Sequence, residues 1–494
     1  MNRPIRRVTV FVGILLLAVV LNLNWVQVIR ADSLKDNSAN RRTTLDQYKR
    51  QRGSIVVQGT PVADSVSTKD ALMYLRRYGA GPEYSAVTGF NSLFYGNTGI
   101  EAAEDKVLSG SDDRFFVERL TNLLTGRDTR GGNVVLTINK QAQAAAWQAM
   151  GGRKGAVVAL DPATGAILAA VSSPSFDPNA LSSHDANKIQ AAYRRYNADP
   201  NNPLENRAFD LTYPPGSVFK LVVSAAALKN GRKPDSRIPA VNALTLPGTN
   251  TQLRNFAGEQ CADGRTDTLD HALTISCNTA FAQLGIDLGT QTLKEQATLF
   301  GMDDNDFSMP LRVAGSSTGP IIDAAALAQS SIGQRDVRVT PLQAAMISAT
   351  IANHGTLMKP YLVSEEQAPN LSVLSHTDPQ VVDQAMSAQQ AEELTRMMVD
   401  VVNKGTGTAA QIPGIQVAGK TGTADNGPQN PDGSYVNPPH AWFSGFAPAD
   451  NPKIAVAVIL ENGGVNGNET TGGLAAAPVA QAVMKAYLAS IGVK

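Results

Sequence analysis

A serine and a lysine three residues apart, Ser217 and Lys220, have the spacing of a nucleophile and its base. They follow the rigid run Thr212-Tyr213-Pro214-Pro215-Gly216 and open an apolar stretch that we expect to be a helix. At a helix N-terminus, outward-pointing N–H groups and the helix dipole favour developing negative charge. One turn later Lys220 projects from the same face, where a neutral amine could take the serine proton. The pair therefore predicts a serine nucleophile with its base on one turn of helix.

Two further motifs give this common tetrad its meaning. Ser276-Cys277-Asn278 lies between two helix-like stretches, and Lys420-Thr421-Gly422-Thr423 lies in a strand-like one. Alone, Ser-x-x-Lys usually marks only a solvated helix start. In this order, the three motifs form the signature set of serine acyl-enzymes that process penicillin or D-Ala-D-Ala peptides.

The length and charge of the chain limit the remaining possibilities. Its 494 residues are too many for one typical domain, so we expect two or three. The formal net charge is zero and the charges are interspersed, which argues against a nucleic-acid partner.

The N-terminus carries a membrane signal. Arg3, Arg6 and Arg7 precede an uncharged run from Val8 to Ile29 that is long enough to span a bilayer. The arginines predict a cytoplasmic N-terminus, with the bulk of the chain extracytoplasmic. A cleaved signal peptide is the alternative, but no small-x-small site follows the run. We expect a single-pass anchor in the cell membrane.

The pattern along the chain predicts three parts. Residues 1–30 form the cytoplasmic tip and anchor, residues 31–140 a membrane-proximal domain, and residues 141–494 the domain with the three motifs. The last part opens with a hairpin, continues with helices and closes with strands. We therefore expect one antiparallel sheet built from both ends of this domain, with helices packed on it. The strands expected in it are Val157–Leu160, Ile167–Val171, Val417–Thr423, His440–Phe446 and Ile454–Glu461.

With these motifs in order, the chain resembles a class B penicillin-binding protein, the monofunctional D,D-transpeptidase kind, and most closely the penicillin-binding protein A type of actinobacteria. Further landmarks of the class match Arg52–Ile55, Gly99–Glu101, Leu136–Asn139 and Ser331–Gln334. The resemblance implies an α/β (α+β) transpeptidase domain of the penicillin-binding/serine β-lactamase-like fold, with an antiparallel sheet flanked by helices. It also implies a smaller mixed α/β N-terminal domain, of dimerisation or pedestal type, and one transmembrane helix.

The resemblance assigns the catalytic roles to four residues. Ser217 would be the acylated nucleophile and Lys220 its base, kept neutral by burial and by a neighbouring cation. Ser276 would relay the proton to the departing D-alanine nitrogen, and Asn278 would hold the substrate peptide.

The last motif would bind substrate. Lys420 would supply positive charge, and the hydroxyls of Thr421 and Thr423 would bind the terminal carboxylate. Gly422 would let the substrate backbone lie against the strand. The N–H groups of Ser217 and Thr423 would form the oxyanion hole.

The partners implied are peptidoglycan stem peptides, β-lactams, the cytoplasmic membrane and cell-wall synthesis proteins that include a glycosyltransferase. No glycosyltransferase domain fits within residues 31–140, and the chemistry needs no metal and no cofactor. The role of this region and the choice between septation and elongation stay open.

The two cysteines are Cys261 and Cys277, the second inside the Ser276–Asn278 motif. An extracytoplasmic compartment would permit a disulfide, which would pin this loop. Two buried free thiols are the alternative.

Four other interpretations of the motifs are possible. A class A β-lactamase needs a deacylating glutamate, and no Glu-x-x-Leu-Asn pattern follows Asn278. A D,D-carboxypeptidase differs only in using water as acceptor, and a scaffold that acylates without turnover would keep the same fold. Gly315–Gly319 matches the nucleophile-elbow pattern, with Asp323 and His440 after it, but adjoining prolines favour a turn. His440 and Trp442 could line the groove, although such residues more often pack a strand end.

Overall fold

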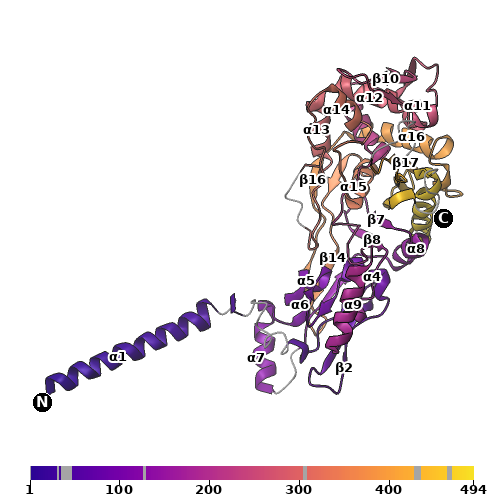
Figure 1. Cartoon of the computed structure of the whole chain (residues 1–494). Coiled ribbons are helices and arrows are strands. Elements are labelled where there is room, and N and C mark those ends of the chain that lie inside the picture. Colours follow the sequence, from indigo (N-terminus) through magenta and orange to yellow (C-terminus); the bar gives the residue numbers. More distant parts are fainter. Residues whose placement is uncertain are drawn as a thin grey trace.

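The N-terminal helix stands apart from the rest of the chain in the computed structural model, which describes residues 2–30, 33–34, 47–125, 130–303, 309–427, 436–463 and 470–493 (Figure 1). Helix α1 (Asn2–Asn24) continues through a π-helical turn, η1 (Trp25–Ile29). The span Arg3–Ile29 is long and apolar enough to cross a membrane, and none of it is buried against the protein. Most of the segment expected to follow it, residues 31–46, lies outside the described residues.

A six-stranded sheet forms the end of the molecule below the domain with the three motifs in Figure 1. Its order is β15-β14-β6-β1-β2-β3. Four of its strands precede residue 140, whereas β14 and β15 follow residue 360, so this sheet closes only when the chain returns to it. The pattern of residues 31–140 does not show this return. The strands are β1 (Ile55–Val57), β2 (Thr60–Ser67), β3 (Tyr74–Tyr78), β6 (Asn133–Leu136), β14 (Val363–Gln367) and β15 (Val373–His376).

A buried carboxylate fixes this part of the protein. Glu101 forms ion pairs of 2.6 Å with both Arg52 and Arg76, and it accepts a hydrogen bond of 3.0 Å from Tyr78. Burial raises the pKa of Glu101, but the two arginines outweigh it and keep the pKa below its usual value. Two sequence landmarks, at Arg52 and at Glu101, are therefore one structural unit. The helices here are α4 (Gly81–Thr88), α5 (Gly99–Ala103), α6 (Asp105–Ser109), α7 (Phe116–Thr125) and α9 (Ala186–Ala198).

The central sheet of the domain with the three motifs confirms the expected antiparallel sheet built from both ends of that domain. Its order is β17-β18-β19-β7-β8, with every neighbouring pair antiparallel. The strands are β7 (Gly155–Leu160), β8 (Ile167–Ser173), β17 (Ala418–Ala424), β18 (His440–Ala447) and β19 (Ile454–Leu460). All residues of β7, β8, β18 and β19 are buried, which explains why β7 and β19 have continuous apolar sequences and why β8 and β18 are mostly apolar.

Helices cover both faces of this sheet. Val157 and Val456 pack in one apolar cluster with residues of α18 (Ala477–Ser490), while their neighbours Ala156 and Ala457 join the larger core. This follows from the alternation of side chains along a strand. Helix α8 (Lys140–Met150) packs beside α18, and α15 (Pro341–Ala352) covers the other face.

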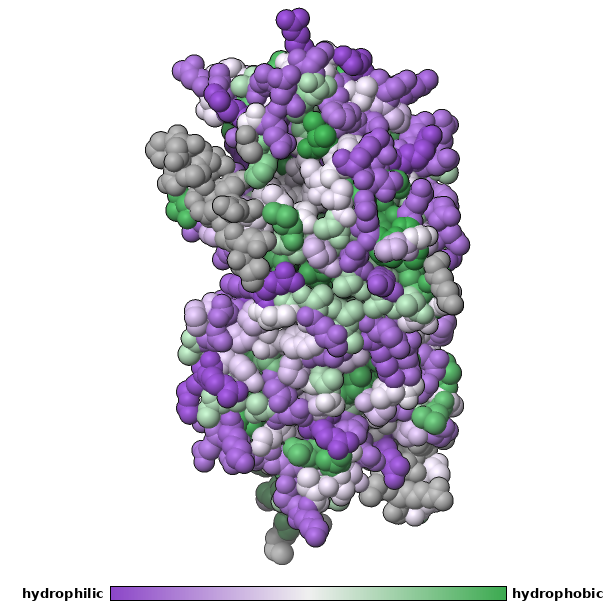
Figure 2. All heavy atoms as spheres, turned by 90° about the vertical axis from the view of Figure 1, so that its right-hand side faces the viewer, coloured by the Kyte–Doolittle hydropathy of each residue, from purple (hydrophilic) through white to green (hydrophobic). Residues whose placement is uncertain are grey.

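A helical lobe lies above the sheet and carries the second motif (Figure 1). Its helices are α10 (Lys220–Lys229), α11 (Leu269–Thr274), α12 (Asn278–Leu288), α13 (Thr290–Leu299), α14 (Ala324–Ser330) and α16 (Ala388–Lys404). Short strand pairs complete it: β9 (Arg237–Pro239) with β12 (Thr266–Thr268), β10 (Ala243–Thr245) with β11 (Gln252–Arg254), and β13 (Thr356–Met358) with β16 (Val381–Gln384). Polar side chains predominate on the face in Figure 2, where apolar side chains form small separate patches.

Candidate active site

Ser217 lies on a tight turn that touches the central sheet. It belongs to a 3₁₀ turn, η4 (Gly216–Phe219), that runs directly into α10. Gly216 has φ of +53°, and a Cβ there would lie 2.5 Å from the carbonyl oxygen of Thr423 on β17. Only glycine therefore lets this turn approach the strand, and the approach brings Ser217 next to the third motif.

Lys220 lies one turn after Ser217 and is fully buried. Its Nζ donates to the carbonyl oxygen of Ser276 at 2.7 Å and to Asn278 Oδ1 at 2.8 Å, and it lies 3.3 Å from Ser276 Oγ. Burial, and then the charge of Lys420, hold the pKa of Lys220 well below its usual value. The amine is therefore suited to accept a proton near neutral pH.

Ser276 and Asn278 lie at the break between α11 and α12. Ser276 has φ of +63°, a left-handed conformation that turns the chain sharply. Asn278 is the first residue of α12, and its side chain also donates to the carbonyl oxygen of Arg254 at 3.4 Å. The sharp break lets both side chains of one motif reach the same lysine.

Lys420 approaches Ser276 from the opposite side. It is fully buried on β17, and its Nζ lies 2.9 Å from Ser276 Oγ and 3.0 Å from the carbonyl oxygen of Thr421. Burial lowers the pKa of Lys420 to about 7. The hydroxyl of Ser276 thus lies between two buried lysines from different elements, an arrangement that can pass a proton.

The remaining residues of the third motif hold the strand against the turn. A Cβ on Gly422 would lie 2.7 Å from the carbonyl oxygen of Pro215, so its missing side chain lets η4 pack on β17. The sequence alone predicts only that this glycine contacts the substrate backbone. Thr421 Oγ1 lies 2.6 Å from Thr406 Oγ1, and Thr423 is partly exposed.

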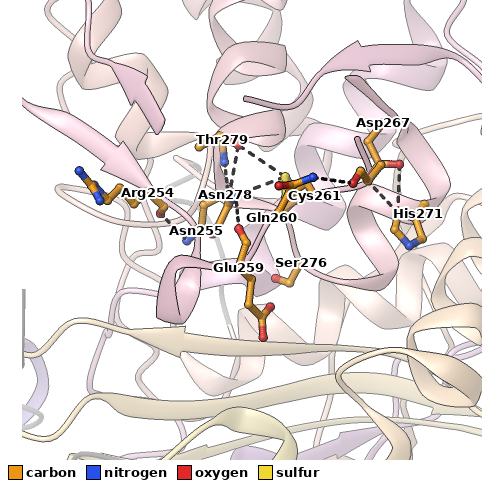
Figure 3. The surroundings of a disulfide bond; sticks show 12 residues. Arg254, Asn255, Glu259, Gln260, Cys261, Asp267, His271, Ser276, Asn278 and Thr279 are labelled. Carbon is orange, nitrogen blue, oxygen red and sulfur yellow. Dashed lines mark hydrogen bonds and ion pairs between the residues drawn. A yellow bond between two sulfur atoms is a disulfide. The ribbon is translucent and has the colours of Figure 1, made fainter. Parts of the chain in front are cut away.

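A disulfide joins Cys261 to Cys277, and Figure 3 shows its surroundings. The two Cα atoms are 6.1 Å apart. Asn255 reinforces the connection, since its Oδ1 accepts from the N–H of Thr279 at 3.0 Å. Residues 254–261 are thereby attached to the start of α12 beside Ser276 and Asn278 (Figure 3).

The structure also shows what the other candidate residues from the sequence do. His440 and Trp442 are buried and pack edge-on against Tyr213, so they pack the strand. Gly315–Gly319 has no strand before it and no helix directly after it within residues 309–330, and Ser317 Oγ accepts from the N–H of Gly319. The segment is therefore not a nucleophile elbow, but it is not the expected turn either, because Ser317 forms an isolated antiparallel β-bridge with Arg338. Among the described residues, no cluster of three or more His, Cys, Asp or Glu residues could hold a metal ion.

The three motifs thus converge, and comparison with known families gives the same result. Residues 155–485 match the penicillin binding protein transpeptidase domain, and residues 52–134 match the penicillin binding protein A dimerisation domain. The chain belongs to the penicillin-binding protein transpeptidase family.

Several members of this penicillin-binding protein family are similar over nearly the full chain. The peptidoglycan D,D-transpeptidase PbpA of Mycolicibacterium smegmatis is 48% identical over 495 residues, covering 99% of each chain. Its namesake from Mycobacterium tuberculosis is 47% identical over 493 residues, again with 99% of each chain covered. The structure of penicillin-binding protein A from M. tuberculosis as a ceftriaxone acyl-enzyme complex has a TM-score of 0.87, at 48% identity, covering 90% of this chain and 100% of that one.

Sequence reasoning missed Thr406 and Asn255, which support the motifs of this penicillin-binding protein from outside them. Thr406 lies between Gly405 and Gly407 after α16, a small-residue run that indicates a close approach but not its partner. Asn255 precedes a short 3₁₀ turn and has no signal of its own in the sequence.

Proposed function

We propose that this chain is a D,D-transpeptidase that cross-links peptidoglycan stem peptides through a serine acyl-enzyme and is acylated by β-lactams. Family membership, the named activity of the mycobacterial relatives and the acyl-enzyme complexes of a similar structure support this function. The observation that carries it is the buried Lys220 amine, one turn after Ser217 and hydrogen-bonded to Ser276 and Asn278.

In the acylation step, Ser217 Oγ attacks the carbonyl carbon of the penultimate D-alanine while Lys220 takes its proton. The N–H groups of Ser217 and Thr423 stabilise the oxyanion, since preorganised donors act most strongly on developing charge. Collapse breaks the C–N bond. Lys220 gives the proton it took to Ser276, which passes its own proton to the leaving D-alanine nitrogen, so that both groups end the step as they began it. With a β-lactam, the broken C–N bond is that of the ring, so the leaving nitrogen stays attached.

In the second step, an amine of another stem peptide attacks the acyl-enzyme carbonyl. A new C–N bond forms while Lys220 takes a proton from the attacking amine; the bond to Ser217 Oγ then breaks, and Lys220 passes that proton to the serine oxygen. Water in place of the amine would give D,D-carboxypeptidase activity, because the residues around the acyl group are the same.

Substrate is held by the third motif and by Asn278. Lys420 supplies positive charge, and the hydroxyls of Thr421 and Thr423 donate to the terminal carboxylate. Because Thr421 can accept from Thr406 while donating to substrate, that hydroxyl pair orients it. Asn278 binds the substrate peptide with its amide.

The arrangement along the chain follows the same function. Residues 1–30 anchor the protein in the cytoplasmic membrane with the arginines inside, residues 31–140 make the membrane-proximal domain together with β14 and β15, and residues 141–494 carry catalysis. The apolar span and the basic residues before it support this orientation. A glycosyltransferase and other cell-wall synthesis proteins are the expected partners, since this chain makes only the peptide cross-link.

Intact-mass spectrometry of the detergent-solubilised full chain with penicillin G tests the acyl-enzyme. We expect a stoichiometric adduct that persists for hours and maps to Ser217, and its loss in Ser217→Ala. Labelling of folded Ser217→Ala at the wild-type rate would contradict the nucleophile assignment. Rapid loss of the wild-type adduct would instead indicate a hydrolase.

A stem-peptide donor with and without an amine acceptor then separates the remaining activities. Cross-linked product that exceeds the hydrolysed product supports a transpeptidase. Hydrolysed product alone would identify a carboxypeptidase, and acylation by penicillin without any peptide product would identify a scaffold.

A further inference from the structure

A buried carboxylate ends the third strand of the central sheet, counted from the edge strand β17. Glu461 directly follows β19, whose seven residues are all apolar. Its Oε1 accepts from Tyr213 OH at 2.7 Å and from Arg207 Nε at 2.9 Å, and its Oε2 pairs with Lys154 Nζ at 3.1 Å. Burying charges is costly unless they are paired and hydrogen-bonded, as they are here. The carboxylate therefore joins the end of β19 to the segment that leads to Ser217.

That segment is attached to three neighbouring strands in turn. Tyr213 contacts Glu461 at the end of β19, and the carbonyl oxygen of Pro214 accepts from Trp442 Nε1 on β18 at 3.0 Å. Gly216 packs on the carbonyl oxygen of Thr423 on β17. Neighbouring strands lie about 4.8 Å apart, so the three attachment points cross about 10 Å of the sheet.

The sheet register places the attachments at one end of these strands. Ala441 on β18 pairs with both Thr423 on β17 and Leu460 on β19, the residue before Glu461. The segment therefore crosses the strand ends as a strap, held at Tyr213, Pro214 and Gly216. Ser217 follows the last of these points.

We propose that Glu461 positions Ser217 against Thr423 by holding Tyr213. The hydrogen bond from the Tyr213 hydroxyl to Glu461 thereby contributes to the rate of acylation. The inference rests on the proposed function, because it concerns the spacing between the two N–H groups of the oxyanion hole. One N–H group follows the strap and the other belongs to β17, so their spacing depends on how the strap lies. Glu461 and Tyr213 are positioning residues and do not touch the substrate.

The groups around the strap keep Tyr213 as the donor and Glu461 as the acceptor of their hydrogen bond. Burial raises the pKa of Glu461, but the hydrogen bond from Tyr213 and the charges of Arg207 and Lys154 lower it below its usual value. Burial and the Glu461 charge raise the pKa of Tyr213, so the phenol keeps its proton and remains the donor. His440, packed edge-on against Tyr213, has its pKa lowered to about 4 by burial and is neutral at pH 7.

The test is Tyr213→Phe in the detergent-solubilised full chain, which removes one hydroxyl and keeps the ring. Rapid-quench kinetics with penicillin G separate the binding constant Ks from the acylation rate constant k2. We expect k2 to fall about tenfold while Ks stays within about twofold, because only the alignment of Ser217 changes.

Tyr78→Phe is the matched control. Tyr78 is also buried and donates to a buried glutamate, Glu101, at 3.0 Å, but in the N-terminal sheet. It should lower the melting temperature and leave k2 at the wild-type value. A fall in k2 equal to that of Tyr213→Phe would show that both variants act only through stability, which would overturn the inference.

A wild-type value of k2 in folded Tyr213→Phe would also overturn the inference that Glu461 positions Ser217 through Tyr213. Should Tyr213→Phe not fold, Trp442→Phe tests the same strap by removing the hydrogen bond to Pro214, and an unchanged k2 would refute the inference in that case. Ser217→Ala in the same assay separates failure of the proposed function from failure of the positioning role. If it still forms the adduct, the proposed function fails, whereas loss of its adduct beside normal k2 in Tyr213→Phe refutes the positioning role alone.

Discussion

Reduction of the Cys261–Cys277 disulfide should destabilise the catalytic domain by an amount that follows from its position. Both cysteines are buried, and they are 16 residues apart in the chain. Reduction leaves both sulfur atoms in place, so the main change is the greater conformational freedom of the unfolded chain. In the chain-entropy description, a loop of this length corresponds to about 3 kcal/mol of unfolding free energy.

The corresponding change in melting temperature follows from the size of the domain. The transpeptidase match covers about 330 residues. At roughly 2.1 cal/mol/K per residue, its unfolding entropy is about 0.7 kcal/mol/K. A loss of about 3 kcal/mol therefore lowers the melting temperature by about 4 °C.

Thermal unfolding of the full chain with and without a phosphine reductant measures this shift, and alkylation followed by mass spectrometry counts the free thiols. The double variant Cys261→Ala/Cys277→Ala is the control, because the reductant should not change its melting temperature. An unchanged wild-type melting temperature with both thiols freed would refute the entropic argument. Two alkylated thiols before reduction would show that the bond does not form in the protein.

Three further predictions concern charge and close packing. Between the folded-state pKa of Lys420, about 7, and its ordinary value of 10.5, the unfolded chain holds a proton that the folded chain lacks. The unfolding free energy should therefore rise with pH across this window, and Lys420→Met should flatten the rise in melts from pH 7 to pH 10. Glu101→Gln should lower the unfolding free energy by about 3–5 kcal/mol in denaturant unfolding, because it removes the charge that pairs with two buried arginines. Asp64→Asn is the control: it breaks an exposed ion pair and should lower the unfolding free energy by under about 1 kcal/mol. Gly216→Ala should reduce penicillin acylation at least tenfold, since its Cβ would meet the Thr423 carbonyl oxygen, and wild-type labelling kinetics would contradict this packing argument.

Local features of the sequence determined the identity of the catalytic groups. Ser217 and Lys220 share one turn because helical geometry fixes their spacing, whatever the rest of the fold does. The hairpin of β7 and β8 was predictable for the same reason, since a Pro/Gly turn between two apolar runs sets its register locally. The apolar span of α1 needed only composition and length.

Only the tertiary structure decided how these groups support one another. The partners of Ser276 come from residues 56 and 144 positions away, and β14 joins β6 across more than 200 residues. Sequence patterns record which face of an element is buried, but not what packs against it. Thr406 beside Thr421 and Glu461 beneath Tyr213 could therefore not be predicted, because a threonine in a loop and a glutamate after a strand are ordinary until the chain brings a partner within hydrogen-bonding distance.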